Sequence, residues 1–347
     1  MKRIISCILV LIAILTLLSG CAPQSVQVSD TRLLMDTYAS ITIHGDVDSQ
    51  LLDDAFALVE ELEGLFSITI EGSDVWRINN AGGEPVEVDE RTIEVIKAGL
   101  EFAELSDGMF DITIGRLTQL WDFGAVDDDT QPLQSRVPNV EELEEALRTI
   151  TQGYTNANTS EDVVPGITIS TSNTIQLTNP DAWIDLGAIA KGFIADTVAE
   201  FLVEQGVSGA VINLGGDIVA VGNRQDGSPW QIALQSPFDD SSEWIGVVGA
   251  SDVAVVASGI YERQFEEDGI IYHHILDPTT GMPVITDVVS AIIISENALI
   301  GEGLSTIAVL VGSERAPTLF DQVQGFIGAV IILDSGEVLT FGEVPLS

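Results

Sequence analysis

Basic residues are scarce in this sequence of 347 residues. It contains 13 Lys and Arg against 54 Asp and Glu, which gives a formal net charge of −41 at pH 7. A field of this sign repels phosphate backbones, so the composition argues against nucleic acid as a partner. Hydrophobic residues at 46% and charged residues at 19% are typical of a globular protein with a large core, in one or two domains.

Cysteine is scarcer still, because only Cys7 and Cys21 are present. Both belong to the N-terminal stretch MKRIISCILVLIAILTLLSGC, where basic residues precede an apolar run and small residues stand directly before Cys21. This pattern predicts a lipoprotein signal peptide over residues 1–20, whose removal leaves Cys21 lipidated at the mature N-terminus. The alternative is a transmembrane anchor. A single remaining cysteine excludes a disulfide framework, so packing must supply the stability.

This N-terminus predicts a protein of the cell envelope. We expect it to be lipid-anchored on the outer side of the cytoplasmic membrane, or periplasmic, with residues 21–30 as a polar tether. Beyond the tether, periodic patterns mix helices and strands without strict alternation, which favours an α+β fold. The expected helices are about 49–64, 89–108, one from near 139, 188–205, 298–312 and 316–323. The expected strands are 37–45, a hairpin over 167–179, then 209–213, 217–221, 230–235, 253–258, 271–276, 288–295 and a hairpin over 326–341.

Two glycine-containing stretches suggest a ligand site. In SDGMFDITIGRLTQLWDFG (residues 106–124), small residues permit close approach of a ligand to the backbone, and aromatic residues offer stacking faces around Asp111. In INLGGDIVAVGN, Asn213 and Asp217 flank a Gly-Gly turn and can reach a ligand. The alternatives are a turn before a core tryptophan and an ordinary two-glycine hairpin.

Histidine is rare as well, yet two of the three histidines, His273 and His274, are adjacent and precede the turn DPTTG. Neighbouring strand residues face opposite ways, so one ring is expected in the core and the other outside it. A neutral imidazole near Asp277 can act as a general base or bind a phosphate.

Two predicted helices carry further candidates. Lys191, one of two lysines beyond the signal peptide, follows WIDLGAIA in the first turn of a helix, where free N–H groups and a fixed charge attract phosphate. Glu302 and Thr306 lie four residues apart on one helix face, with Ser305 beside them, and oxygen ligands of this kind suit Mg²⁺. The alternatives are a solvated lysine and a polar surface stripe.

Taken in order, these stretches resemble the FAD:protein FMN transferases, the ApbE-type enzymes formerly called thiamine biosynthesis lipoproteins, over nearly the whole mature chain. The matching segments are 35–37, 110–124, 185–192, 213–217, 258–263 and 273–281. The resemblance implies an ApbE-type flavin transferase domain over residues 31–347. It also implies a reaction in which FAD is the substrate, FMN passes through a phosphoester bond to a Thr or Ser of a target protein, AMP is released and Mg²⁺ assists.

The same resemblance implies roles for individual residues. FAD contacts fall on Met35, Met109, Phe110, Asp111, Asp185, Lys191 and Ile275. Metal ligands fall on the carbonyl of Ala188, on Glu302 and on Thr306, and His274 lies near the pyrophosphate as a base or phosphate partner. The implied acceptor is a membrane electron-transfer subunit.

Two residues depart from the family pattern. Glu302 replaces the usual aspartate, and Asp36 replaces the glycine that usually follows Met35. Glu302 is one methylene longer than aspartate, which affects metal affinity, and Asp36 adds negative charge where FAD is expected, which affects FAD affinity. Two other functions remain open at this stage, which are a Mg²⁺-dependent FAD pyrophosphatase that yields FMN and AMP, and a non-catalytic FAD-binding lipoprotein.

Overall fold

The computed structural model describes residues 27–45, 47–123, 137–150, 163–164, 166–170, 172–238 and 244–346. The predicted signal peptide, Cys21 and Gly124, the last residue of the segment 110–124, lie outside these residues. Among the described residues, no helix is both long enough and apolar enough to cross a bilayer.

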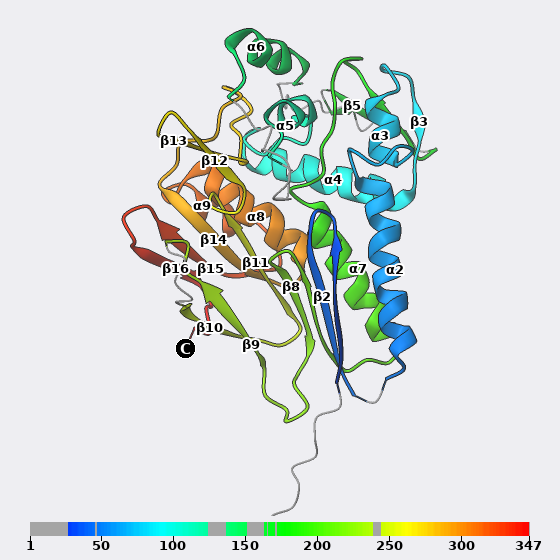
Figure 1. Cartoon of the computed structure of the whole chain (residues 1–347), viewed down its shortest axis with the longest axis vertical. Helices are drawn as coiled ribbons and strands as arrows, with labels where there is room; N and C mark the ends of the chain where they lie inside the picture. The colour runs from blue at the N-terminus through cyan, green and yellow to red at the C-terminus, as the bar shows by residue number, and fades with distance from the viewer. Residues whose placement is uncertain are drawn as a thin grey trace, which may run out of the picture.

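An eight-stranded antiparallel sheet forms the centre of the molecule (Figure 1). Its order is β1 (Gln27–Leu34), β2 (Thr37–His44), β7 (Gly209–Leu214), β8 (Asp217–Gly222), β11 (Val253–Gly259), β14 (Val288–Ser295), β15 (Phe326–Leu333) and β16 (Val338–Gly342). The predicted tether over residues 21–30 is therefore wrong at its end, because residues 27–30 pair with β2. As an edge strand, β1 exposes every second side chain, so its polar sequence reads as a tether.

Helices cover one face of this sheet (Figure 1). These are α2 (Ser49–Phe66), α7 (Ala190–Glu204) and α8 (Ala298–Val311), with α4 (Glu90–Leu105) packed behind α8. Alternate strand residues such as Ile41, Ile212 and Val256 point into this core, where they are fully buried. The inward-facing alternate side chains of the strands thus pack against the apolar faces of the helices.

A two-stranded ribbon, β9 (Trp230–Gln235) with β10 (Trp244–Ala250), covers part of the opposite face. Its inward residues Trp230, Ile232 and Leu234 form a second buried cluster with sheet residues such as Val255 and Ile292. The sheet therefore has one core on each face.

Smaller elements gather at one end of the sheet (Figure 1). They are α3 (Asp74–Asn79), α5 (Gly115–Trp121), α6 (Val140–Thr149), α9 (Ala316–Phe320), the sheet β3 (Val86–Glu87), β6 (Thr174–Leu177), β5 (Ile167–Ser170) and β4 (Val163–Val164), and the hairpin β12 (Gln264–Glu267) with β13 (Ile270–His273). Trp121 anchors α5 to the chain after β13, since its Nε1 donates to the carbonyl oxygen of Gly281 at 2.7 Å.

The α+β prediction is confirmed, and so are the long helices and the central strands. Apart from the edge strand β1, the elements that the sequence did not predict are short or irregular. The helices α3 and α5 span about two turns or less, too little for a clear helical period, and β10 carries two glycines. The predicted strand 271–276 ends earlier, at His273, because Asp277 begins a turn in which its side chain accepts from the backbone N–H and the hydroxyl of Thr279.

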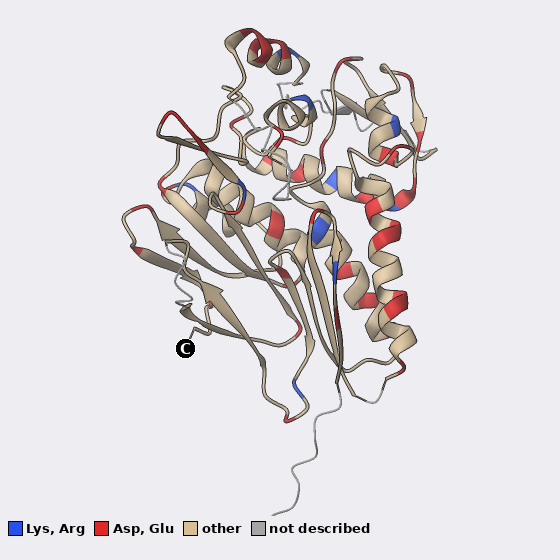
Figure 2. Cartoon of the chain, viewed as in Figure 1, with Lys and Arg blue, Asp and Glu red and all other residues tan. Residues whose placement is uncertain are grey.

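Acidic residues far outnumber basic ones along the chain. Acidic residues line the outer helices and loops, whereas Lys and Arg are few (Figure 2).

The tight contact between α8 and α4 gives a stability prediction. A Cβ on Gly303 would lie 2.3 Å from the Phe102 ring, whereas a Cβ on Gly64, in α2, meets nothing within 4 Å. We expect Gly303→Ala to lower the free energy of unfolding by about 1–3 kcal/mol through overpacking. The control Gly64→Ala should raise it by about 0.5–1 kcal/mol through helix propensity. Urea denaturation measures both, and equal effects would contradict the packing described.

Candidate functional site

A cleft of about 1550 Å³ lies where the sheet, α7, α8 and the smaller elements meet. Every catalytic, FAD-contacting or metal-binding residue proposed from the sequence lines it: Met35, Met109, Phe110, Asp111, Asp185, Ala188, Lys191, His274, Ile275, Glu302 and Thr306. These residues come from five separate parts of the chain. The fold therefore brings the proposed site residues together, and their individual roles remain predictions.

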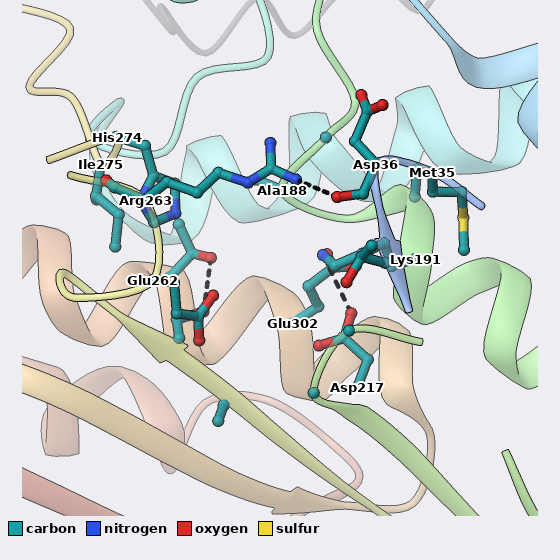
Figure 3. A pocket seen from close by; sticks show the side chains of 18 of the residues that line it. Met35, Asp36, Ala188, Lys191, Asp217, Glu262, Arg263, His274, Ile275 and Glu302 are labelled. Carbon is teal, nitrogen blue, oxygen red and sulfur yellow. Dashed lines mark hydrogen bonds and ion pairs between the residues drawn. The ribbon is translucent and has the colours of Figure 1, made fainter. Parts of the chain in front are cut away.

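Lys191 forms the electrostatic centre of the cleft (Figure 3). Its Nζ contacts Glu302 Oε1 and lies 3.2 Å from Asp217 Oδ2. Both acids are only 2% exposed. Burial disfavours the ammonium form, but the charges of Asp217 and Glu302 outweigh this and raise the pKa of Lys191. The lysine is therefore charged at any physiological pH.

For two of the acids around Lys191, Asp217 and Glu262, burial outweighs the attraction of the lysine, so their pKa values rise. Burial, together with the charge of Glu302, raises the pKa of Asp217 well above its usual value, and Lys191 offsets this only in part. Glu262 is open to the cleft yet surrounded by protein, and the resulting desolvation raises its pKa to about 7. Three acids thus surround one lysine, and a cation beside them would favour their charged forms.

The helices α7 and α8 hold Lys191 and Glu302 in place through a close approach. A Cβ on Gly192 would lie 2.6 Å from the Ala298 carbonyl oxygen, so only glycine allows this spacing. The backbone N–H of Gly192 donates to Glu302 Oε2 at 2.7 Å. Asp196, one turn further along α7, accepts from Ala298 N at 2.7 Å and Leu299 N at 2.9 Å, at the first turn of α8.

The two histidines separate as the alternation predicted. His273 is buried and its Nε2 donates to the Val284 carbonyl at 3.2 Å, whereas His274 lines the cleft. The Nδ1 of His274 lies 3.3 Å from the carbonyl oxygen of Arg263, which can only accept. The proton therefore sits on Nδ1 and the lone pair on Nε2. Burial and the nearby charge of Arg263 lower the pKa of His274 to about 4, so the ring is neutral at pH 7.

Asp185 and Asp111 are held by backbone pairing at the opposite wall. Asn79 is 4% exposed and clamps Ile184, donating to its carbonyl at 2.9 Å and accepting from its N–H at 2.7 Å. On the other side, Asp185 N donates to the Ile112 carbonyl at 2.8 Å. Thr118 donates to Asp185 Oδ2 at 2.6 Å. Asp185 is therefore placed by contacts with distant segments, whereas the Asp111 carboxylate accepts from the backbone N–H and the hydroxyl of Thr113, both at 2.7 Å.

The turn between β1 and β2 forms one lip of the cleft. Met35 and Asp36 both have φ of +54°, a conformation that glycine adopts without cost and aspartate tolerates better than most residues. Asp36 therefore fits the position that glycine usually holds. Its carbonyl oxygen accepts from Arg263 Nη2 at 3.4 Å, which joins this lip to the segment after β11 (Figure 3).

The comparisons with known proteins agree with this architecture. A family model described as the ApbE family matches residues 35–331. The chain belongs to the ApbE family. An FAD:protein FMN transferase of Vibrio cholerae O1 is 33% identical over 94% of both chains, and one of Treponema pallidum is 31% identical over 82% of this chain and 77% of its own.

Solved ApbE structures have the same fold. The flavin transferase ApbE of Vibrio cholerae superposes with a TM-score of 0.77 at 29% identity, covering 92% of this chain and 97% of that chain. The ApbE protein of Thermotoga maritima gives 0.77 at 32% identity, covering 90% and 96%. The ApbE-type fold that the resemblance implied is confirmed.

Sequence reasoning gave no role to several cleft residues of this ApbE chain. Ser258, Tyr261, Glu262 and Arg263 line the cleft, and all belong to the stretch SGIYERQF. The sequence signal for them was the segment 258–263, which matched the family pattern but received no residue roles.

The proposed metal ligands lie among oxygen donors. In addition to Glu302, the hydroxyls of Ser258, Ser305 and Thr306 form a cluster, in which Ser258 Oγ lies 2.8 Å from Ser305 Oγ and 3.3 Å from Thr306 Oγ1. Asp217 Oδ2, buried beside them, has no hydrogen-bond partner beyond its ion pair. Hard oxygen donors of this kind fit Mg²⁺. In the described part of the chain, no three His, Cys, Asp or Glu side chains form a metal-binding group.

The junction of α7 and α8 gives a pH prediction. Burial raises the pKa of Asp196 to about 7, despite its two backbone hydrogen bonds. Because the folded-state pKa exceeds the unfolded value, the folded protein binds the proton more tightly, and stability falls as pH rises from about 4 to about 7. Denaturation at several pH values should show that Asp196→Asn removes part of this slope. An unchanged slope would contradict the shifted pKa.

Proposed function

We propose that this ApbE-family protein transfers FMN from FAD to a Thr or Ser hydroxyl of an acceptor protein and releases AMP. The observation that carries the proposal is the charged Lys191 in the first turn of α7, inside a large cleft of an otherwise acidic protein. An ammonium binds phosphate oxygens as a compact positive charge. The relatives named FAD:protein FMN transferase support the same reaction.

In the proposed reaction the acceptor oxygen attacks the FMN-side phosphorus of FAD. A phosphoester P–O bond forms, the bond from this phosphorus to the bridging oxygen breaks, and that oxygen leaves with AMP. The hydroxyl proton passes to the lone pair on His274 Nε2, which is available because Nδ1 is engaged with the Arg263 carbonyl. Lys191 binds the phosphate oxygens, and such positioning and charge neutralisation supply most of the catalysis in phosphoryl transfer.

Mg²⁺ is the proposed cofactor. Glu302, Thr306 and the carbonyl of Ala188 would hold it, and Asp217 supplies a further buried oxygen nearby. When bound, the ion would neutralise charge on the transferring phosphoryl group. One oxygen of Glu302 contacts Lys191 and the other accepts from Gly192 N, and each oxygen keeps a second lone pair that could bind the ion.

The cell-envelope assignment is part of the proposal. A lipid on Cys21 would hold the enzyme at the outer side of the cytoplasmic membrane, close to an acceptor that is itself a membrane electron-transfer subunit.

The test uses the mature chain with FAD, Mg²⁺ and a candidate acceptor domain. In-gel flavin fluorescence reports transfer, while AMP and FMN are quantified in parallel. We expect a fluorescent acceptor band that disappears with a chelator and with Thr306→Ala. Free FMN and AMP with a dark acceptor would indicate a pyrophosphatase, and intact bound FAD would indicate a carrier.

The role of His274 gives a separate prediction. His274→Gln keeps a polar side chain but cannot take a proton, so kcat should fall about 10²–10⁴-fold while the Kd for FAD changes little. In the wild type, kcat/KM should stay constant as the pH falls through 6. It should decline only towards about 4, which is the pKa of the His274 ring in the enzyme without substrate. An acid limb near pH 6.5, or a variant with unchanged kcat, would contradict this assignment.

A further inference from the structure

The cleft is larger than a single small molecule requires. Pockets for one ligand usually span about 300–1,000 Å³, whereas this one spans about 1550 Å³. Its lining divides into two arms. The helix-side arm contains the proposed FAD and metal residues, and the ribbon-side arm consists of Ile218, Ile232, Ala233, Leu234, Gln235, Val255, Ala257 and Ile292.

Strand alternation places the ribbon-side arm on the other face of the sheet. In β8, Asp217 points towards Lys191 on the helix side, and Ile218 therefore points towards the ribbon. Ile218 pairs with Val255 of β11, and Ala257 pairs with Ile292 of β14, so these side chains share one surface. The arms meet at the Gly215-Gly216 turn, which also lines the cleft.

The strand β9 presents its edge to this arm. Four consecutive residues, 232–235, line the cleft, although successive strand side chains point to opposite faces. A strand lines a cleft with side chains from both of its faces when its edge borders that cleft. In the described part of the chain β9 pairs with β10 alone, so its other edge carries backbone N–H and C=O groups with no strand beside them.

The ribbon-side arm is also uncharged. All acidic residues that line the cleft belong to the helix side or to its lips, and the ribbon-side arm holds no Asp, Glu, Lys or Arg. In a protein of net charge −41 such a surface suits an uncharged occupant. The ribbon–sheet cluster buries Ile232, Leu234, Val255 and Ile292, so the accessible part of this arm is Ile218, Ala233, Gln235 and Ala257. Uncharged, partly exposed residues beside a free strand edge are the arrangement by which proteins bind an extended peptide.

We propose that the ribbon-side arm docks an extended, uncharged segment of the acceptor protein, which adds as a strand to the free edge of β9. The inference rests on the proposed transferase function and extends it to the second substrate. An in-line displacement requires the acceptor oxygen to approach the phosphorus opposite the departing AMP. Residues of the ribbon-side arm, the Gly215-Gly216 turn, Lys191 and Asp217 all line the same cleft, so a segment docked in this arm would have its Thr or Ser in the cleft that holds the proposed phosphate site.

The experiment compares two exposed residues on the same face of β9. Ala233 lines the cleft, and Gln231, two residues away, does not. A charge at a strand edge blocks pairing, so Ala233→Glu should impair docking and Gln231→Glu should not. The probes are a short synthetic peptide with one Thr and apolar flanks, and the same peptide with N-methylated amides outside the Thr. Flavin labelling of the peptide, FAD affinity and AMP release are measured for each enzyme.

We expect wild type and Gln231→Glu to label the ordinary peptide and not the N-methylated one. Ala233→Glu should lose about tenfold or more in labelling, which corresponds to one or two backbone hydrogen bonds, with its FAD affinity retained. Equal labelling by Ala233→Glu, or of the N-methylated peptide, would overturn the docking site. Weakened FAD binding in Ala233→Glu would assign the arm to the flavin and overturn it too. AMP release by the wild type without labelling of either peptide would overturn the transferase function itself.

Discussion

The buried contact of Lys191 with Glu302 and Asp217 is the interaction on which the site depends. A lone lysine in this cleft would be costly, and so would two buried carboxylates without a cation. The two acids raise the pKa of Lys191 despite its burial, whereas burial and the charge of Glu302 raise the pKa of Asp217 and favour its protonated form. The acids suit the proposed Mg²⁺, and the ion together with Lys191 would offset the charge of the proposed phosphate ligand. Removing Lys191 would leave two buried acids without a cation.

The fold brings these three groups together by very close packing. Lys191 lies on α7, Glu302 on α8 and Asp217 at the start of β8, and they meet because Gly192 lets the two helices approach to backbone contact. Asp196 then fixes the first turn of α8 from α7. The sheet adds the second constraint, since alternation along β8 places Asp217 on the helix side and Ile218 on the ribbon side. One turn of glycines thus separates two chemically different arms of one cleft.

The sequence could predict the parts of this site that depend on local periodicity. The helix spacing of Glu302 and Thr306 and the split between His273 and His274 follow from periods of 3.6 and 2, and both were found in the structure. Contacts between distant segments could not be predicted in this way. Asn79 clamps Ile184 across a separation of 105 residues, and Arg263 reaches the carbonyl of Asp36 across 227. Such contacts depend on sheet order and loop paths, which local patterns do not encode.

The central claim is that the charge of Lys191 makes the cleft a site for phosphate groups. Isothermal titration with FAD tests it most directly on the wild type, on Lys191→Arg and on Lys191→Met, with circular dichroism to verify that each is folded. We predict that Lys191→Met loses at least about tenfold in affinity and that Lys191→Arg, which keeps the charge, loses less. A folded Lys191→Met that binds FAD as tightly as the wild type would contradict the account.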